Sequence, residues 1–413
     1  MATPYDVIVL GLGGMGSAAL RALAGRGSRV LGLEQFEPGH DRGSSSGGSR
    51  MIRQAYFEGP AYVPLLLRAY DLWRAAEHDL GERLLTLNGG AFLGRPESRT
   101  VTGSLAAARH WDLPHELLDA AEISRRWPAM HPDAATVAVV EPSAGFVYPE
   151  RAVTGNCRLA AAAGAEVRTG ERVLSWQAAG TGDGVRVTTA AGSYEAGRLV
   201  VTAGPWAPQV LADLELPLTV ERQLQFWFAP DGPEYDVGRL PVFICEHDDG
   251  AQVYGFPNAD GLGPKFGIFR LDMPPVSADT VDRTVHEEEV ARMRRHLERL
   301  LPVAAAAPLA KSVTCLYTTS PDEHFVIDRH PEHPQVALAT GFSGHGFKFV
   351  PVVGEILADL VTDGTSRHDI EMFRLARPAV AAACTITCRR GRGRPSRSRP
   401  RTPARAARPR PAG

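Results

Sequence analysis

Residues 5–16 read Tyr5-Asp-Val-Ile-Val-Leu-Gly11-Leu-Gly13-Gly-Met-Gly16, an apolar run that leads into a GxGxxG pattern. An apolar run rich in valine and isoleucine is typical of a strand that is buried on both faces. The three glycines leave space for a tight turn, for a pyrophosphate beside the backbone and for a close helix–strand contact. The following residues 17–24 predict a helix whose N-terminal amides favour negative charge.

Glu34 completes this pattern at the end of the next apolar run, 18 residues after Gly16. A carboxylate at this place accepts hydrogen bonds from a ribose 2′-hydroxyl and repels a 2′-phosphate. Strand, glycine turn, helix, second strand and acid follow one another in order. The stretch therefore predicts an adenine-dinucleotide site rather than an ordinary glycine-rich turn. The pattern by itself leaves NAD and FAD open.

Length and composition limit the class of protein. A chain of 413 residues is too long for one small core and suggests two or three domains. Its 44% hydrophobic and 22% charged residues are typical of a soluble globular protein. No apolar run has the length of a membrane span, and Asp6 stands too early for the apolar core of a signal peptide, so we expect a cytoplasmic protein without membrane contact. Five cysteines are an odd number and lack metal-ligand spacing, which predicts neither a disulfide framework nor a metal site.

Charge is distributed unevenly along the chain. The net charge is −2, yet residues 389–410 contain ten arginines and no acid, so the remainder carries about −12. An acidic body argues against nucleic acid as a partner. Residues 378–413 are rich in Arg, Pro, Ala and Gly, cannot bury a core, and are expected to be disordered. We interpret this tail as an extension unrelated to the chemistry; a nucleic-acid-binding arm is the alternative.

Residues 39–50 form a polar stretch that begins soon after Glu34 and is expected to cross near the cofactor. The hydroxyls and amides of Ser44 and Ser45 could bind phosphate or ribose, and the alternative is a solvated loop.

Arg50 and Arg53 follow this stretch at i and i+3, a spacing that places both side chains on the same side of a helical turn. Neighbouring guanidinium groups repel each other unless an acid or an anion lies between them. The spacing therefore predicts either an anion site or a surface pair bonded to Glu58 or Asp41, and the sequence leaves both open.

Two later glycine turns are further candidates for contact with the cofactor. Gly204 follows the apolar run 198–202, and residues 341–349 precede a predicted helix at 350–362, whose N-terminus would favour an anion. Residues 166–176 predict a strand of a meander, and Val173 within it is a candidate cofactor contact.

Alternating runs at 216–229, 242–256 and 265–271 predict a second sheet. On the last of these strands Lys265, Gly267 and Phe269 share one face.

Three long motifs carry a resemblance to a known family. They are Gly43-Ser-Ser-Ser-Gly-Gly-Ser-Arg50-Met-Ile-Arg53-Gln-Ala-Tyr56, Cys315-Leu-Tyr-Thr-Thr-Ser-Pro-Asp322-Glu-His-Phe-Val-Ile-Asp328 and Gly341-Phe-Ser-Gly-His-Gly-Phe-Lys348-Phe. Together they resemble the monomeric sarcosine oxidase / N-methyl-L-tryptophan oxidase family of flavoproteins. The likeness extends over residues 5–378. It implies FAD, rather than a nicotinamide, as the cofactor.

The resemblance also implies an α/β fold of two discontinuous domains. A Rossmann-like FAD-binding domain is expected from residues 1–85, 140–215 and 310–377. A mixed-sheet α+β substrate domain is expected from residues 86–139 and 216–309. The active site of such a monomer lies between the domains, on one face of the flavin.

Individual roles follow from the same resemblance. Cys315 matches the cysteine that forms a thioether to the flavin ring, and a thiolate there would need nearby cations. Arg53 and Lys348 match the pair that holds the substrate carboxylate, where a planar fork and a point charge fix its orientation. Lys265 matches the lysine that promotes the reaction of reduced flavin with O₂.

The complete set of candidates has three groups. The catalytic candidates are Lys265, Arg50 on the re-oxidation side of the flavin, Tyr254 near the substrate and His345 near the ring. The substrate-binding candidates are Arg53, Lys348, Tyr254 and Phe269. The cofactor-binding candidates are Gly11, Gly13, Gly16, Glu34, Ser44, Ser45, Arg50, Val173, Gly204, Cys315, Gly344, Gly346 and Lys348.

Two positions depart from the family. Ser46 stands where a histidine often precedes the first arginine by four residues, and Phe269 stands where a histidine follows the lysine by four. The loss of an imidazole beside the substrate amine makes the surface more apolar, which favours a bulkier or more apolar amino acid over sarcosine.

These inferences predict an FAD-dependent oxidase that converts a secondary amino acid, N-methyl or cyclic, to an imine and releases H₂O₂ from O₂. Three alternatives stay open. One is an amine dehydrogenase of the same fold with another electron acceptor, and the second is an oxidase of pipecolate or proline. The third is a non-catalytic flavin- or nucleotide-binding sensor.

Overall fold

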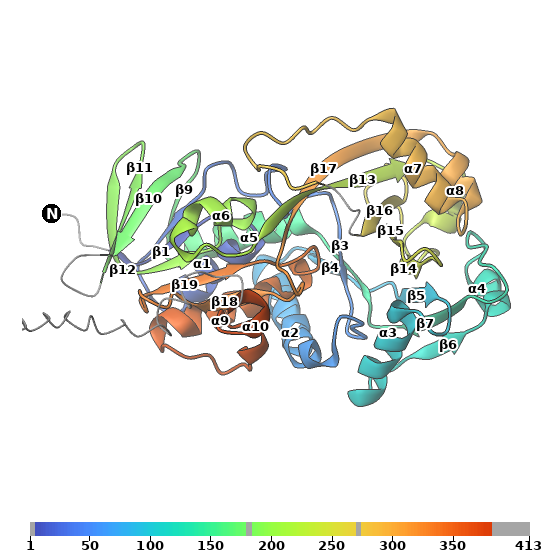
Figure 1. Cartoon of the computed structure of the whole chain (residues 1–413), viewed down its shortest axis with the longest axis horizontal. Coiled ribbons are helices and arrows are strands. Elements are labelled where there is room, and N and C mark those ends of the chain that lie inside the picture. Colours follow the sequence, from blue (N-terminus) through green and yellow to red (C-terminus); the bar gives the residue numbers. More distant parts are fainter. Residues whose placement is uncertain (1–4, 179–183, 270–273, 382–413) are drawn as a thin grey trace, which may run out of the picture.

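The computed structural model describes residues 5–178, 184–269 and 274–381 (Figure 1). Pro378–Ala381 (α10), predicted as the start of the disordered tail, instead form a short helix, because the side chain of Val380 is buried. The rest of the predicted tail, residues 382–413, lies outside the described part of the chain.

The first large sheet is built around β1 (Tyr5–Leu10), as the opening pattern predicts. β12 (Ser193–Val201) and β2 (Val30–Leu33) pair with it in parallel, and β19 (Val336–Thr340) and β9 (Glu166–Arg168) continue the parallel part on either side. β2 and β19 are buried along their whole length. Their sequences are continuously apolar because parallel strands of this kind are covered on both faces.

Three antiparallel strands extend the same sheet: β10 (Val173–Ala178), β11 (Val185–Thr189) and β18 (Val326–Arg329). The single strand predicted for residues 166–176 is therefore wrong. Its first part, β9, joins the parallel strand β2, whereas β10 pairs with β11 in the opposite direction.

Helices cover the sheet and bring the glycine turn into place. α1 (Gly14–Gly25) packs against α5 (Pro149–Ala162) and α9 (Val350–Thr362), and α2 (Val63–Leu80) packs on α9 (Figure 1). Helix α9 can approach α1 closely because Gly354 has no side chain. A Cβ atom there would lie 2.6 Å from the backbone of Ala18.

The second large sheet has the strand order β17-β13-β16-β15-β14-β5-β7-β6. It is mixed, because β14 and β5 run parallel while the other described pairs are antiparallel. Its strands are β5 (Gly90–Gly94), β6 (Glu116–Leu118), β7 (Val137–Glu141), β13 (Thr219–Phe228), β14 (Val242–Glu246), β15 (Gln252–Phe256), β16 (Lys265–Phe269) and β17 (Leu309–Thr319). In Figure 1, α7 (Glu287–Leu297) and α8 (Pro302–Ala306) lie at the outer end of this sheet.

Strand β17 corrects the predicted domain division. It pairs with β13 from Leu309 to Thr319, so it belongs to the second sheet and not to a cofactor domain that begins at residue 310. Figure 1 shows β13 and β17 running together from the middle of the molecule to the far end of the second sheet. We propose the predicted two-domain division with one change, which is that β17 belongs to the second domain.

A small third sheet connects the two large ones. It consists of β3 (Arg50–Ile52), β8 (Gly145–Val147) and β4 (Leu85–Thr86), and Figure 1 places β3 and β4 between the large sheets. The remaining α-helices are α3 (Arg99–His110), α4 (Ala120–Arg126) and α6 (Ala207–Val210). The 3₁₀ turns are Pro60–Tyr62, Gly204–Trp206, Ala212–Leu214, Pro233–Tyr235, Phe347–Phe349 and Glu371–Phe373.

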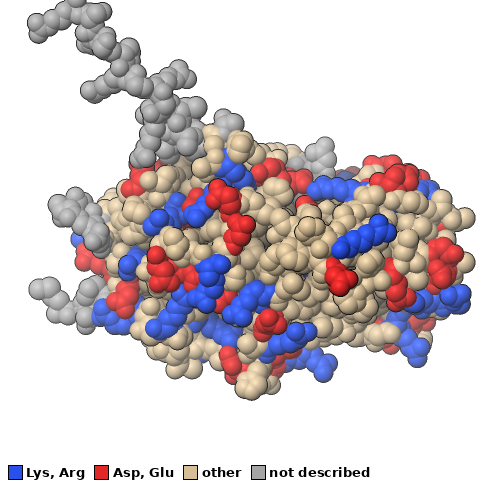
Figure 2. Space-filling model, turned by 90° about the horizontal axis from the view of Figure 1, so that it is seen from below, with Lys and Arg blue, Asp and Glu red and all other residues tan. Residues whose placement is uncertain are grey.

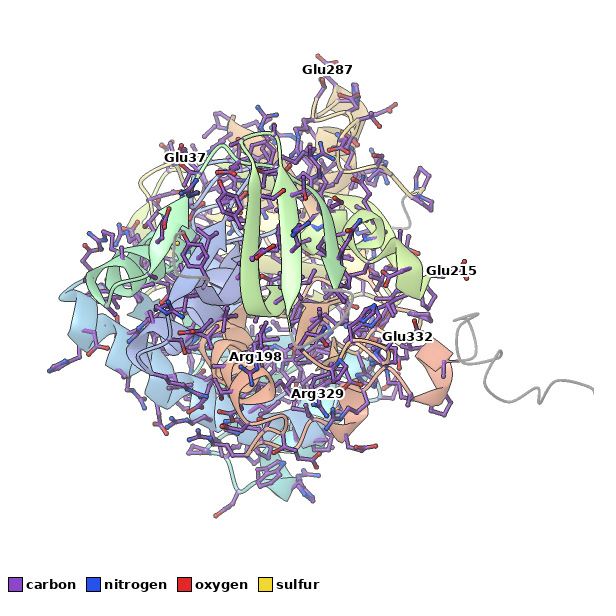
Figure 3. All side chains as sticks on the ribbon, turned by 90° about the vertical axis from the view of Figure 1, so that its left-hand side faces the viewer. Glu37, Arg198, Glu215, Glu287, Arg329 and Glu332 are labelled. Atoms are coloured by element: carbon purple, nitrogen blue, oxygen red, sulfur yellow. The ribbon has the colours of Figure 1, made fainter. Side chains whose placement is uncertain are left out.

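The surface carries both signs of charge. Figure 2 shows acidic and basic side chains interspersed over the face that it presents. Seen from the side of β10–β12, the labelled acids Glu37, Glu215 and Glu287 lie at the rim of the molecule and are exposed (Figure 3). Within the described residues, no helix combines the length and the hydropathy needed to cross a lipid bilayer.

Candidate functional site

A cavity of about 950 Å³ lies beyond the carboxyl ends of β1, β12 and β19. Ligands of open parallel sheets bind at this edge. Gly11 forms part of the wall with φ +86°, and a Cβ atom there would lie 2.6 Å from the carbonyl oxygen of Thr202. The Thr202 hydroxyl donates to the carbonyl of Gly11 at 2.8 Å, so the neighbouring strand fixes the turn.

The other two glycines of the pattern differ in what they face. A Cβ atom at Gly16 would lie 1.8 Å from the carbonyl oxygen of Gly11, so this glycine permits the helix–strand contact. Among the described residues other than its chain neighbours, only the Ser45 hydroxyl would lie within 4 Å of a Cβ atom at Gly13, at 3.5 Å, and Gly13 lines the cavity. The turn is therefore open where a pyrophosphate would approach, and these residues fit a dinucleotide cofactor.

Glu34 lies at the same end of the cavity with 4% of its surface exposed. One carboxylate oxygen accepts from the amide of Leu12 at 2.8 Å, and the other accepts from the amide of Phe36 at 3.0 Å. Each oxygen keeps a lone pair for a further donor, such as a ribose hydroxyl. The His40 ring lies 3.5 Å away and also lines the cavity.

Most candidate cofactor residues meet in this cavity. Those that line it are Gly11, Gly13, Glu34, Ser44, Ser45, Arg50, Val173, Gly204, Gly344 and Gly346. Gly16, Cys315 and Lys348 lie behind the wall and are buried.

Cys315 is buried behind the wall of the cavity, next to the lining residue Leu316. Its sulfur is 3.5 Å from Nη2 of Arg50, which also donates to the carbonyl of Ser44 at 3.2 Å. A guanidinium group beside a thiol stabilises negative charge on the sulfur.

The structure separates the two arginines that were expected to face the same way. Arg50 belongs to strand β3, where neighbouring side chains alternate between faces, and the residues do not form a helical turn. Arg53 instead donates twice to Glu58, at 2.6 Å to each carboxylate oxygen, and 2% and 3% of the two side chains are exposed. The pair with Glu58 exists, but it is buried and not on the surface.

Lys348 joins this buried pair. Its Nζ donates to the carbonyl of His345 at 2.7 Å, and 4% of the residue is exposed. Burial, together with the charge of Arg53, lowers the pKa of Lys348 to about 7. Burial opposes the charged form of Glu58, yet Arg53, His345 and Lys348 lower the pKa of that carboxyl to about 2. With Lys348 protonated, this cluster holds two cations and one anion.

Lys265 occupies a separate buried position on β16. Its Nζ donates to the carbonyls of Gly47 and Ser49, at 2.8 and 2.6 Å. It lies 4.1 Å from the centre of the Phe256 ring. Burial, and then the charge of Arg50, lower its pKa well below the ordinary value. The contacts place this lysine behind the loop that carries Ser44, Ser45 and Arg50.

Aromatic side chains gather near the glycine turn at residues 341–346. The ring of Phe269 lies 6.1 Å from that of Tyr317, and a Cβ atom at Gly344 would lie 2.4 Å from the Tyr317 ring. Tyr254 packs over Gly267 on the neighbouring strand, and burial raises the pKa of its hydroxyl. These contacts bring Tyr254, Tyr317 and Phe269 together on the side of β15–β17 that faces the turn.

Several buried residues of the site have no signal of their own in the sequence. Glu141 accepts from the amides of Gln54 and Ala55 and thereby holds the segment after β3, and Tyr56 contacts both Arg53 and His345. The sequence predicts Glu58 only as a possible partner of the two arginines at the surface. A buried acid that binds backbone amides from a distant segment is invisible to local patterns, because its partners are about 90 residues apart in the chain.

Comparison with known proteins agrees with this geometry. Residues 6–360 match the family described as "FAD dependent oxidoreductase". A monomeric sarcosine oxidase of Streptomyces avermitilis is 52% identical over 93% of this chain and 100% of its own length. An N-methyl-L-tryptophan oxidase of Salmonella dublin is 34% identical over 90% of this chain and 99% of its own. The solved structure of NikD, described as an unusual amino acid oxidase, superposes with a TM-score of 0.80, at 26% identity over 90% and 98% of the two chains.

These matches confirm the predicted FAD dependence, the predicted family and the two-domain flavoprotein fold. The chain belongs to the family of FAD dependent oxidoreductases that contains the monomeric sarcosine oxidases and the N-methyl-L-tryptophan oxidases.

Proposed function

We propose that the protein is an oxidase of secondary amino acids, N-methyl or cyclic, which forms an imine and passes the electrons to O₂ to give H₂O₂. The names of the two relatives, one an oxidase of sarcosine and the other of N-methyl-L-tryptophan, support this substrate class. In this reaction bound FAD supplies the acceptor for a hydride equivalent from the carbon beside the amine.

The observation that carries the proposal is the buried cluster of Arg53, Lys348 and Glu58. It contains one more positive than negative charge when Lys348 is protonated. A buried excess charge is costly unless an anion balances it. The carboxylate of an amino acid would supply that anion, and a guanidinium fork with an ammonium group would fix its orientation.

The other side chains of the site have roles that follow from their positions. We assign Tyr254 and Phe269 to the walls around the substrate, and His345 to the support of Lys348 through its carbonyl. The apolar ring of Phe269 favours a bulkier or more apolar substituent on the amino acid. Arg50 lines the cavity, and Lys265 lies behind the loop that carries Ser44 and Ser45; we propose that their positive charge stabilises negative charge developing on O₂.

The cofactor attachment and the assembly are part of the same proposal. We assign Cys315 as the residue that binds the flavin ring through a thioether, supported by its position directly before the lining residue Leu316 and by Arg50 beside its sulfur. We also propose that the enzyme acts as a monomer, which the name of the Streptomyces relative supports.

Substitution of the two cations tests the function. Arg53→Ala and Lys348→Ala should each raise KM for amino acids by about 100-fold or more, because a charge-assisted hydrogen bond to a carboxylate is lost. Bound FAD, followed by its visible absorbance, should remain. Peroxide release should be measured over N-methyl amino acids, pipecolate, proline and primary amino acids. Unchanged KM in both variants would refute the carboxylate assignment, and reduced flavin that O₂ re-oxidises slowly in stopped flow would identify a dehydrogenase instead.

A further inference from the structure

Tyr56 lies at the centre of the buried cluster of Arg53, Lys348 and Glu58. It is fully buried, four residues beyond the end of β3, and the amides of Gln54 and Ala55 just before it are held by the buried carboxylate of Glu141. The position of its ring is therefore fixed from the backbone side. The side chain of Tyr62 packs against it at 5.0 Å between ring centres.

The face of the Tyr56 ring meets both cations of the cluster. The guanidinium carbon of Arg53 lies 4.2 Å from the ring centre, and Nζ of Lys348 lies 5.1 Å from it. The negative face of an aromatic ring attracts cations at such distances, most strongly where water is excluded. The ring therefore holds two groups of like charge that would otherwise repel each other.

The hydroxyl of Tyr56 reaches the residue that supports Lys348. It lies 2.5 Å from Nδ1 of His345 and 3.3 Å from the carbonyl oxygen of the same residue. Nε2 of His345 lies 3.0 Å from the carbonyl of Glu323, which can only accept, so Nε2 carries the proton of the neutral ring. Nδ1 is then the acceptor, and Tyr56 donates to it.

These two sets of contacts converge on one geometry. The carbonyl of His345 is the acceptor for Nζ of Lys348, and the hydroxyl of Tyr56 holds the ring of His345 in place through Nδ1. We infer that Tyr56 is a positioning residue for the substrate carboxylate, which acts through Arg53 with its ring and through His345 and Lys348 with its hydroxyl. This inference rests on the proposed function of the Arg53–Lys348 pair.

The chain offers a matched control for the test. Tyr62 is also fully buried, and its hydroxyl lies 2.8 Å from Nδ1 of His324, so Tyr62→Phe removes an equivalent hydroxyl–imidazole contact from the same aromatic cluster. Arg53 and Lys348 both lie over the ring of Tyr56, whereas the hydroxyl of Tyr62 bonds to His324. Tyr56→Phe keeps the ring face and removes only the hydroxyl, whereas Tyr56→Leu removes both.

The holoenzymes should be compared by steady-state kinetics, by thermal melting and by titration with propionate, a carboxylate without an amine, at pH 5.5–9. Tyr56→Phe should raise KM about two- to tenfold while kcat changes less than twofold, and Tyr56→Leu should raise KM further. The pH at which propionate affinity falls, expected near 7 for the wild type from the pKa of Lys348, should move lower in Tyr56→Phe because the ammonium group loses a fixed acceptor. Tyr62→Phe should lose a similar amount of thermal stability and keep both KM and this pH.

The outcomes separate the two ideas. If Tyr56→Phe behaves like Tyr62→Phe while Arg53→Ala and Lys348→Ala raise KM, the role of Tyr56 is refuted and the carboxylate site stands. If the arginine and lysine variants leave KM unchanged, the proposed function itself fails.

Discussion

Removal of the charge of Glu58 should weaken the fold and strengthen the binding of carboxylates at the same time. Glu58→Gln keeps the shape of the side chain but leaves Arg53 without its counter-ion, in a place where 2% and 3% of the two side chains are exposed. The pKa of Glu58, about 2 against an ordinary 4.5, corresponds to about 3 kcal/mol of stabilisation of the folded state. Loss of one partner of a buried ion pair costs a similar amount, about 3–5 kcal/mol.

The sign of the pH dependence follows from the lowered pKa. A carboxyl whose pKa is lower in the folded state stabilises the protein fully above about pH 4.5, and this contribution disappears as the pH falls towards 2. At pH 7 the variant should therefore show the whole loss, about 3 kcal/mol, which lowers Tm by about 4 °C for a chain of this length. The difference from the wild type should shrink in acid.

The effect on binding has the opposite sign. Without Glu58, the cluster of Arg53 and protonated Lys348 has two uncompensated positive charges instead of one. At an effective dielectric constant of about 20, one extra charge about 8 Å away is worth about 2 kcal/mol, so propionate should bind at least about tenfold more tightly. Glu58 also raises the pKa of Lys348, so the gain should be largest near pH 6, where the lysine is protonated in both proteins.

The assay is a propionate titration of the flavin absorbance at pH 6 and pH 9, with thermal melts of the same samples. Glu289→Gln is the matched control, because Glu289 forms another buried ion pair, with Arg222, in the second sheet domain. It should lower Tm without any change in propionate affinity. If Glu58→Gln lowers Tm and propionate binding at pH 6 stays the same or weakens, carboxylates do not bind at this cluster and the reasoning is wrong.

Three further predictions follow from the site. In the wild type, propionate affinity should fall as the pH rises through about 7, because the ammonium form of Lys348 binds the anion and is lost above that pH; a flat titration would exclude Lys348. Acid-precipitated protein should stay yellow in the wild type and in Cys157→Ser, another buried cysteine, but not in Cys315→Ser; a colourless wild-type pellet would rule out the thioether. Gly13→Ala should fold normally and bind FAD at least about tenfold more weakly, whereas Gly16→Ala should lose stability even without cofactor, which differential melting with and without FAD would show.

The dinucleotide half of the site was predictable because its signal is local. Strand, turn, helix and acid occupy residues 5–34, and the structure brings Gly11, Gly13 and Glu34 to one cavity. Each element there follows from a periodicity or from a glycine whose missing side chain the backbone requires. The same reasoning predicted α9 with its observed bounds, because it is a long apolar run next to a glycine turn.

The directions of the Arg50 and Arg53 side chains could not be predicted from such local patterns. Four residues are too few to distinguish a helical turn from a strand by periodicity, and β3 is a strand only because β8, almost 100 residues away, pairs with it. Because the segment is a strand, the side chain of Arg50 contacts Cys315 and that of Arg53 contacts Glu58. Long-range pairing likewise assigns β17 to the second sheet, where a boundary drawn from resemblance divides it.

Glu58 and the substrate carboxylate are two anions for the same pair of cations, and this relation determines how binding must occur. Arg53 cannot keep both bonds to Glu58 and also donate its fork to a ligand, because one Nη atom makes both contacts at 2.6 Å. The backbone after Arg53 is not free to follow, since Glu141 holds the amides of Gln54 and Ala55. Exchange of partners must therefore occur by rotation of the Arg53 side chain, over the ring of Tyr56. The acid that stabilises the ligand-free fold thus competes with a carboxylate ligand for Arg53, and Glu58→Gln, which removes this competitor, should strengthen the binding of carboxylates.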